Sequence, residues 1–245
     1  MKDKKHPLGC FFFTLTLSNL YFYNIKAFFF LFYFFFIGLL LGQEKDSLSY
    51  NEDQFYIDVN FIIQANDINS FQENGFSRSI HAGFLRDFSF TKKGDKAIAI
   101  GLGYGFERLV NNLNVRKNEN EFSYSFPSNG VSLRNTFSFH QLQLPIELRW
   151  RTSTIDNYRF WRIYLGYRLS YQFLPTYKPF FGRSFKIDDQ IEEWQHSLSL
   201  SVGFNTWNLR FSYGLTPFLS SAVQTQEGIR PNIYPVQVGL IFYLL

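Results

Sequence analysis

The sequence contains very little cysteine and has no long apolar run after its first 42 residues. The single cysteine, Cys10, lies near the N-terminus, so residues 43–245 can form no disulfide bond and offer no thiol for catalysis. No stretch after residue 42 is apolar enough to form a membrane helix, which needs roughly 20 such residues. These two absences exclude a disulfide-stabilised fold and a helical membrane domain for this part of the chain.

Charge is also scarce, whereas aromatic side chains are abundant. Charged residues make up 18% of the 245 residues and aromatic residues 21%, with 32 Phe and 15 Tyr. Part of the Phe enrichment is what an AT-rich genome would produce. The mean hydropathy is nevertheless slightly polar, at −0.14. This combination is expected of membrane strands that alternate between a lipid-facing and a polar surface.

The first 42 residues have the features of a secretory leader. Lys26 precedes the apolar run 27–41, and Gly42 precedes the polar residues that begin at Gln43. We therefore expect a signal peptide that is cleaved near residue 42, with a retained anchor helix as the alternative. Residues 1–25 contain a second apolar run that a signal does not need, which suggests that the true start lies downstream of Met1.

The positive charge gives no indication of nucleic-acid binding. The formal net charge is +4, but four Lys and one Asp lie within residues 1–42, so the remainder carries only +1. The basic residues of this remainder are spread along the chain and do not gather on one helix. We expect no nucleic-acid partner.

Strict alternation of apolar and polar residues predicts β-strands. In segment 140–151, six apolar-set residues from His140 to Trp150 alternate with polar residues, and segment 160–173 repeats the pattern from Trp161 to Phe173. A helix would not place apolar residues at a strict spacing of two. The same period predicts eight strands, at residues 55–65, 80–84, 98–107, 140–151, 160–173, 198–204, 210–216 and 234–244.

The connections between these segments alternate in length. Long polar connections lie near 67–77, 111–137, 174–193 and 218–230, and short ones near 91–95, 152–158 and 205–208. Long outer loops and short periplasmic turns are typical of bacterial outer-membrane barrels. We therefore predict that residues 43–245 form a closed, antiparallel, transmembrane β-barrel of eight strands, all-β in class. Ten strands would result if part of 111–137 joined the barrel.

A soluble eight-stranded barrel would show the same alternation with its apolar set inside. Two features favour the membrane barrel: charged residues recur in the polar set, and aromatic residues gather near the strand ends, as membrane-interface girdles do. The aromatic residues on the expected loop side are Tyr104, Phe106, Tyr171, Phe173, Tyr213 and Tyr234, and those on the turn side are Trp150, Trp161, Phe204 and Phe242.

One hairpin carries a family resemblance. Residues 142–171, above all the run Leu144–Arg151 and the run Phe160–Tyr164, resemble the central hairpin of the PorT-like outer-membrane barrel proteins of the Bacteroidetes. The run Gln237–Leu244 resembles the C-terminal insertion signal of outer-membrane barrels, with Leu244 in place of the usual last aromatic residue. The resemblance implies a porin-like barrel of the cell envelope and a link to secretion or gliding machinery. It supplies no catalytic residues.

The sequence offers no convincing catalytic or metal site. By strand parity His81 faces inward, whereas His140 and His196 lie on the lipid-facing set near the outer rim. Four acidic residues of the third long loop could bind a divalent cation, but a solvated acidic loop is the favoured interpretation. They are Asp188, Asp189, Glu192 and Glu193. We expect no enzymatic activity, no cofactor and no resident metal.

A cluster of inward charges is the most distinctive candidate site. Its members share the polar face of the predicted strands. They are Glu107, Glu147, Arg149, Arg162, Arg168 and Arg210. Charges inside a narrow barrel must pair, so the first interpretation is a salt-bridged plug. The alternative is a narrow pore lined by the arginines.

These observations lead to one principal functional hypothesis and one alternative. The first is a non-enzymatic, plugged outer-membrane barrel whose extracellular loops, including 111–137 with its aromatic run 122–126, act in binding or in envelope and secretion support. The alternative is a small diffusion pore. Expected partners are outer-membrane lipid and an envelope or secretion-machinery protein, and the oligomeric state stays open.

Overall fold

The computed structural model describes residues 53–91, 93–119, 121–127, 133–152, 161–204 and 207–244. The expected leader, residues 1–42, lies outside these ranges. Within them no helix has the length and apolar character needed to span a membrane.

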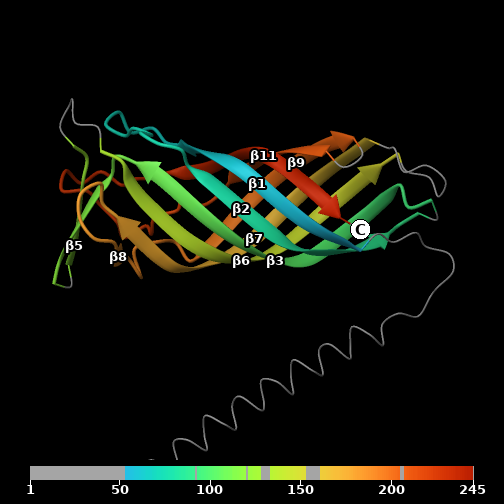
Figure 1. Ribbon diagram of the computed structural model, residues 1–245, viewed down its shortest axis with the longest axis horizontal. Coiled ribbons are helices and arrows are strands. Elements are labelled where there is room, and N and C mark those ends of the chain that lie inside the picture. Colours follow the sequence, from blue (N-terminus) through green and yellow to red (C-terminus); the bar gives the residue numbers. More distant parts are fainter. Residues whose placement is uncertain are drawn as a thin grey trace, which may run out of the picture. The chain divides into compact units, whose positions relative to one another are not determined.

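Eight long antiparallel strands close into a barrel (Figure 1). Each strand pairs with its neighbours in the chain, and pairing between β1 and β11 closes the ring. The eight strands are β1 (Gln54–Ala65), β2 (Arg78–Ser89), β3 (Lys96–Asn111), β6 (Asn135–Arg151), β7 (Trp161–Lys178), β9 (Trp194–Phe204), β10 (Trp207–Gly214) and β11 (Tyr234–Leu244). The predicted count of eight is confirmed.

The remaining strands belong to the extracellular loops, which gather at the end of the barrel where Figure 1 labels β5 and β8. β4 (Asn114–Asn118) and β5 (Glu121–Ser125) form a two-stranded sheet that is separate from the barrel sheet, so the ten-stranded alternative is wrong. β8 (Phe185–Lys186) adds a short pairing to β7. At the opposite end, the β2–β3 turn uses Gly94 with a φ of +71°, a value that favours glycine.

The predicted faces are confirmed along the membrane-spanning part of the strands. Odd-numbered β1 residues from Phe55 to Ile63 are exposed on the outer wall, and even-numbered residues from Gln54 to Gln64 are buried inside. The lipid-facing wall is apolar and includes aromatic side chains near both rims, such as Tyr104 and Trp161. Alternation therefore matches the two environments of a barrel wall.

Three strands continue beyond the predicted boundaries on the loop side. β3 continues to Asn111, β6 begins as early as Asn135, and β7 continues to Lys178. In these extensions the alternation of apolar and polar side chains between the two faces is inverted. Apolar side chains such as Phe137 and Tyr177 now point inward, while Ser138 and Lys178 point outward. Outside the membrane the barrel is built like a soluble one, with its apolar set inside.

A bulge accompanies this inversion on β7. The register between β6 and β7 shifts between Ser138 and His140. Opposite this point Leu174 has a φ of +52°, an uncommon left-handed conformation for a branched residue. The extra residue moves the β7 side chains beyond it by one position, which brings Tyr177 to the inner face.

Candidate functional site

All six predicted cluster charges lie inside the barrel and are buried. Each is at most 7% exposed, and each comes from an inward position of its strand. The structure arranges them, with further charges, into an upper group near the loops and a lower group near the turns. Arg210 links the two groups.

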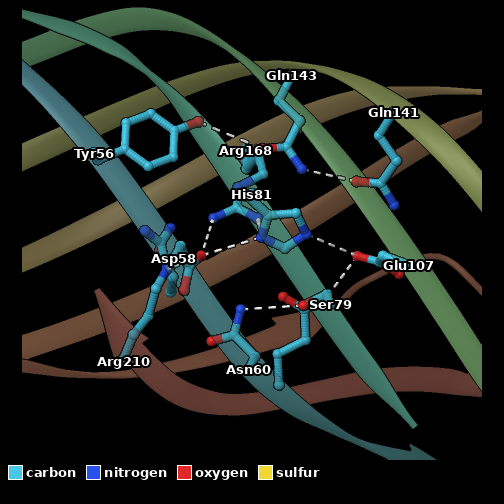
Figure 2. Close-up of polar contacts among 12 residues, drawn as sticks. Tyr56, Asp58, Asn60, Ser79, His81, Glu107, Gln141, Gln143, Arg168 and Arg210 are labelled. Atoms are coloured by element: carbon cyan, nitrogen blue, oxygen red, sulfur yellow. Dashed lines mark hydrogen bonds and ion pairs between the residues drawn. The ribbon is translucent and has the colours of Figure 1, made fainter. Parts of the chain in front are cut away.

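His81 is the centre of the upper group (Figure 2). Its Nδ1 lies 3.1 Å from Oδ2 of Asp58, and its Nε2 lies 3.3 Å from Oε1 of Glu107. Arg168 completes the group: Nη1 approaches His81 Nδ1 at 3.0 Å, and Nη2 donates to Asp58 Oδ2 at 3.1 Å. Gln237 donates to the same oxygen of Glu107 at 2.6 Å, so residues of β2 and β11 both hold this carboxylate.

Glycines make room for this group. Gly105 stands directly opposite His81 in the β2–β3 register, and a Cβ placed there would lie 2.4 Å from the imidazole ring. A Cβ on Gly103 would lie 2.0 Å from the hydroxyl of Tyr56. Both glycines serve packing of the lumen, since long side chains from other strands fill the space above them.

Arg149 is the centre of the lower group. It donates to Glu147 from Nε at 3.1 Å and from Nη2 at 2.9 Å, donates to Gln54 at 3.2 Å, and forms an ion pair with Asp87. Its guanidinium also lies 4.8 Å from the ring centroid of Tyr164. Arg151 binds the second oxygen of Asp87 at 2.7 Å. This carboxylate is therefore shared between two arginines.

Arg210 joins the two groups. Its Nε lies 3.7 Å from Asp58 and its Nη1 lies 3.6 Å from Glu147. Arg210 thus approaches a β6 charge across the lumen. Glu107 lies instead in the upper group, where it lines a small cavity together with Arg168. Arg162 lies against the ring of Tyr243 at 6.0 Å.

Sequence reasoning left three lumen charges out of the cluster. Asp58, Asp87 and Arg151 are not among the charges predicted for the cluster, although all three are buried inside the barrel. The alternation does indicate Asp87, because it follows His81 by six residues and so lies on the same inward face of the strand. The predicted strand ends at residue 84, because Arg86 interrupts the outward apolar set.

A small cavity lies inside the described barrel, next to the upper group of charges. The cavity lined by Glu107, Gln141, Arg168, Ser170 and Gln237 measures about 20 Å³. That is enough for about one water molecule. At this level the inward side chains therefore leave little free space, as expected for eight strands.

A cluster of buried apolar residues lies at the loop end of the barrel. A core of buried apolar residues fills the inverted part of the barrel; we call it the apolar cap. Phe137 is its centre and contacts Tyr177 and Phe218 with ring centroids 5.0 Å and 5.3 Å away. The cap contains Ile62, Leu109, Leu113, Val115, Tyr124, Phe137, Phe139, Tyr177, Ile187, Ile191, Phe218, Leu219, Val223 and Ile233.

The cap also ties the loops together. Tyr124, from the β4–β5 hairpin, donates through its hydroxyl to Gln190 at 2.8 Å. Its backbone carbonyl oxygen accepts from the backbone N–H of Gln226 at 3.0 Å. Burial raises the pKa of the Tyr124 phenol, because the charged form would lose its hydration. Much of the aromatic run 122–126, which was predicted to take part in binding, therefore packs into or against the cap.

The outer surface of the loops carries one open groove of about 450 Å³. β4 forms one wall with Arg116 and Lys117, and the segment after β7 forms the other with Phe180 and Phe181. The two Phe rings pack edge to face at 4.6 Å, yet Phe181 remains 80% exposed. We call this the loop groove; it combines positive charge with exposed aromatic surface.

The other predicted candidates are placed as follows. His140 and His196 lie on the outer wall, as expected, in contact with the hydroxyls of Tyr104 and Tyr167, the latter at 2.7 Å. Around Asp188, as elsewhere in the described ranges, no three His, Cys, Asp or Glu side chains are arranged to hold a metal ion.

Comparison with known proteins identifies the family. Residues 56–220 match the family model described as outer membrane protein beta-barrel domain. The chain belongs to this family. It is therefore an outer-membrane β-barrel protein, and the match covers most of the strands described above.

A search of curated proteins found no match. Among solved structures, two of Ail, the attachment invasion locus protein of Yersinia pestis, are similar. One, in complex with the heparin analogue sucrose octasulfate, has 11% identity and a TM-score of 0.31, with 78% of this chain and 99% of Ail covered. The other has 12% identity and a TM-score of 0.30, with 79% and 99% covered.

Proposed function

We propose that this protein is a closed, non-conducting barrel of the outer membrane that acts through its extracellular loops. The apolar cap is the observation that carries this proposal. A diffusion pore needs a continuous hydrated path, whereas here an apolar core lies across the loop end of the lumen. Beneath it the lumen is filled by side chains that bind one another.

The arginines give no support to an anion-selective pore. Such a pore needs guanidinium groups that face water and attract passing anions. Arg149, Arg168 and Arg210 instead lie within reach of carboxylates on other strands. Their role in the proposal is to brace the barrel from inside.

The loop groove is the proposed binding site. Arg116 and Lys117 would attract a negatively charged partner, and the exposed rings of Phe180 and Phe181 would pack against its apolar parts. Interlocked loops favour binding, since a preformed surface loses little conformational entropy when it is occupied. An acidic protein segment of the envelope fits this chemistry.

Planar-bilayer recording tests the closed barrel. Protein purified from membranes and shown to be folded by its heat-modifiable gel mobility should give no stepwise conductance. Steady conductance from such a preparation, lowered by Arg149→Gln, would contradict the proposal and favour the pore.

Binding of a labelled poly-glutamate peptide tests the groove. Fluorescence anisotropy should detect binding that weakens at least about tenfold in R116Q/K117Q and in F180A/F181A. The matched control is Arg230→Gln, an arginine of another loop that leaves the groove intact. Equal binding by all variants would remove the groove from the proposal.

The finer affiliation also belongs to the proposal. We infer a PorT-like protein of the Bacteroidetes that supports secretion or gliding without enzymatic activity, on the resemblance of segment 142–171. A deletion strain should then show impaired secretion or motility, restored by the wild-type chain and not by F180A/F181A. Normal secretion and motility would argue against this role.

A further inference from the structure

The outer wall carries an unusual pair of positive charges on β2 and β3. Arg78 and Arg108 stand directly opposite each other in the β2–β3 register. Both occupy outward positions of their strands, where Ile80 and Phe106 are the next outward residues toward the membrane centre. The pair lies at the level where the outer wall changes from apolar to polar, and Ser138 continues this level on β6.

Like charges at directly opposed positions destabilise a sheet unless an anion compensates them. Within the described ranges, the ion pairs of the protein include neither Arg78 nor Arg108. The residue opposite Arg78 on its other side is Phe61, which offers no charge. Among the described residues, no ion pair therefore compensates the two charges.

A groove lies on the same strands, closer to the membrane centre. It measures about 600 Å³ and is walled by apolar side chains that include Ile57, Phe84, Leu102 and Tyr104. Ala82 causes it: this small residue stands between Ile57 and Tyr104 in the register, in a wall otherwise built of large side chains. Four residues separate Arg78 from Ala82, which is roughly 13 Å along a strand.

We propose that this face is a binding site for a phosphate-bearing lipid of the outer leaflet. The phosphate would bind between the guanidinium groups of Arg78 and Arg108, which suit its oxygens, and one acyl chain would occupy the groove at Ala82. A second copy of the chain is a poorer occupant, because its own arginine pair would add positive charge. The site is separate from the loop groove and does not depend on the loop-binding proposal.

Thermal unfolding in mixed micelles tests the site. The full-length protein would be purified from membranes and mixed with dioleoyl phosphatidic acid or with dioleoyl phosphatidylcholine at equal mole fraction. Loss of the heat-modifiable band gives the unfolding midpoint. We expect phosphatidic acid to raise the midpoint by at least about 3 °C over phosphatidylcholine, because a ligand of the folded state stabilises it.

Two variants test the two halves of the site, and a third serves as the control. R78Q/R108Q should abolish the rise, and Ala82→Phe, which fills the groove, should reduce it by at least half. Arg86→Gln is the matched control, since Arg86 is an outward arginine of the same strand whose opposite residue is the apolar Ile100. Each variant is compared with itself in phosphatidylcholine, so that a change in basal stability cancels.

Three outcomes would overturn the proposal. A full rise in R78Q/R108Q would show that the pair binds no phosphate. An equal loss in Arg86→Gln would show a general effect of wall charge. The same rise with inorganic phosphate alone would show an anion site that needs no acyl chain.

Discussion

Replacing Arg149 by Met should weaken the barrel more than any other single change of a lumen charge. Arg149 is completely buried and binds two carboxylates and one amide. Its hydrogen bonds to Glu147 and Gln54 measure 2.9–3.2 Å. Met preserves much of the side-chain volume, so the main loss is electrostatic. Both Asp87 and Glu147 would remain buried with one partner fewer.

The magnitude follows from what compensates these carboxylates afterwards. Breaking a buried ion pair from one side costs roughly 3–5 kcal/mol. Asp87 would keep Arg151 at 2.7 Å and Glu147 would keep Arg210 at 3.6 Å, so the loss should lie at the lower end. We expect about 3 kcal/mol of unfolding free energy, which is roughly a hundredfold in the folded-to-unfolded ratio.

Urea unfolding in phospholipid vesicles, followed by tryptophan fluorescence and by gel mobility, measures this loss. Arg86→Met is the matched control, because Arg86 lies exposed on the outer wall and should change the free energy by less than about 0.5 kcal/mol. R149M/E147Q, which removes one stranded carboxylate together with the arginine while Asp87 keeps Arg151 and Arg210 keeps Asp58, should recover part of the loss. If Arg149→Met unfolds like the wild type, the lumen is wet and the network does not brace it.

Three further changes probe the rest of the fold. Phe137→Ala should cost about 3–5 kcal/mol and raise proteolysis of the loops, because it removes the centre of the apolar cap; unchanged protease resistance would mean that the loops do not depend on the cap. Gly101→Ala should prevent normal β2–β3 pairing, since its Cβ would lie 1.9 Å from the carbonyl oxygen of Phe84, and failure to form a heat-modifiable band would report this. Tyr124 should ionise above the usual tyrosine range in an absorbance titration of the folded protein. Since folding raises the pKa of Tyr124, the stability that the neutral phenol gives to the cap is complete below about pH 10 and falls as the pH rises further. Titration in the ordinary tyrosine range would show that Tyr124 is exposed.

The membrane-spanning part of the fold could be predicted because one rule governs it. Alternation with the apolar set outside identified all eight strands and the inward position of every charge in the predicted cluster. The rule stops working where the wall leaves the lipid. At residues such as Ser138 and Lys178 the phase inverts, so the extensions of β3, β6 and β7 were assigned to loops.

Partner choice inside the lumen was the other limit. Parity places a side chain on a face, but register and side-chain length decide which residues meet across the barrel. The Asp58–Arg168 contact joins β1 to β7, which are not neighbours in the sheet, so strand patterns could not predict it. The loop groove depends on how separate loops pack together, which leaves no periodic signal.

The pairing of β1 with β11 concentrates the cost of folding at one seam. Every other barrel pairing joins strands that follow each other in the chain, whereas Phe55 must find Leu244. The chain entropy lost on closing so long a loop falls almost entirely on this last ladder. A nascent barrel therefore remains an open sheet with two unsaturated edges until β11 arrives, and a chain truncated before Tyr234 would keep those edges and pair with others of its kind.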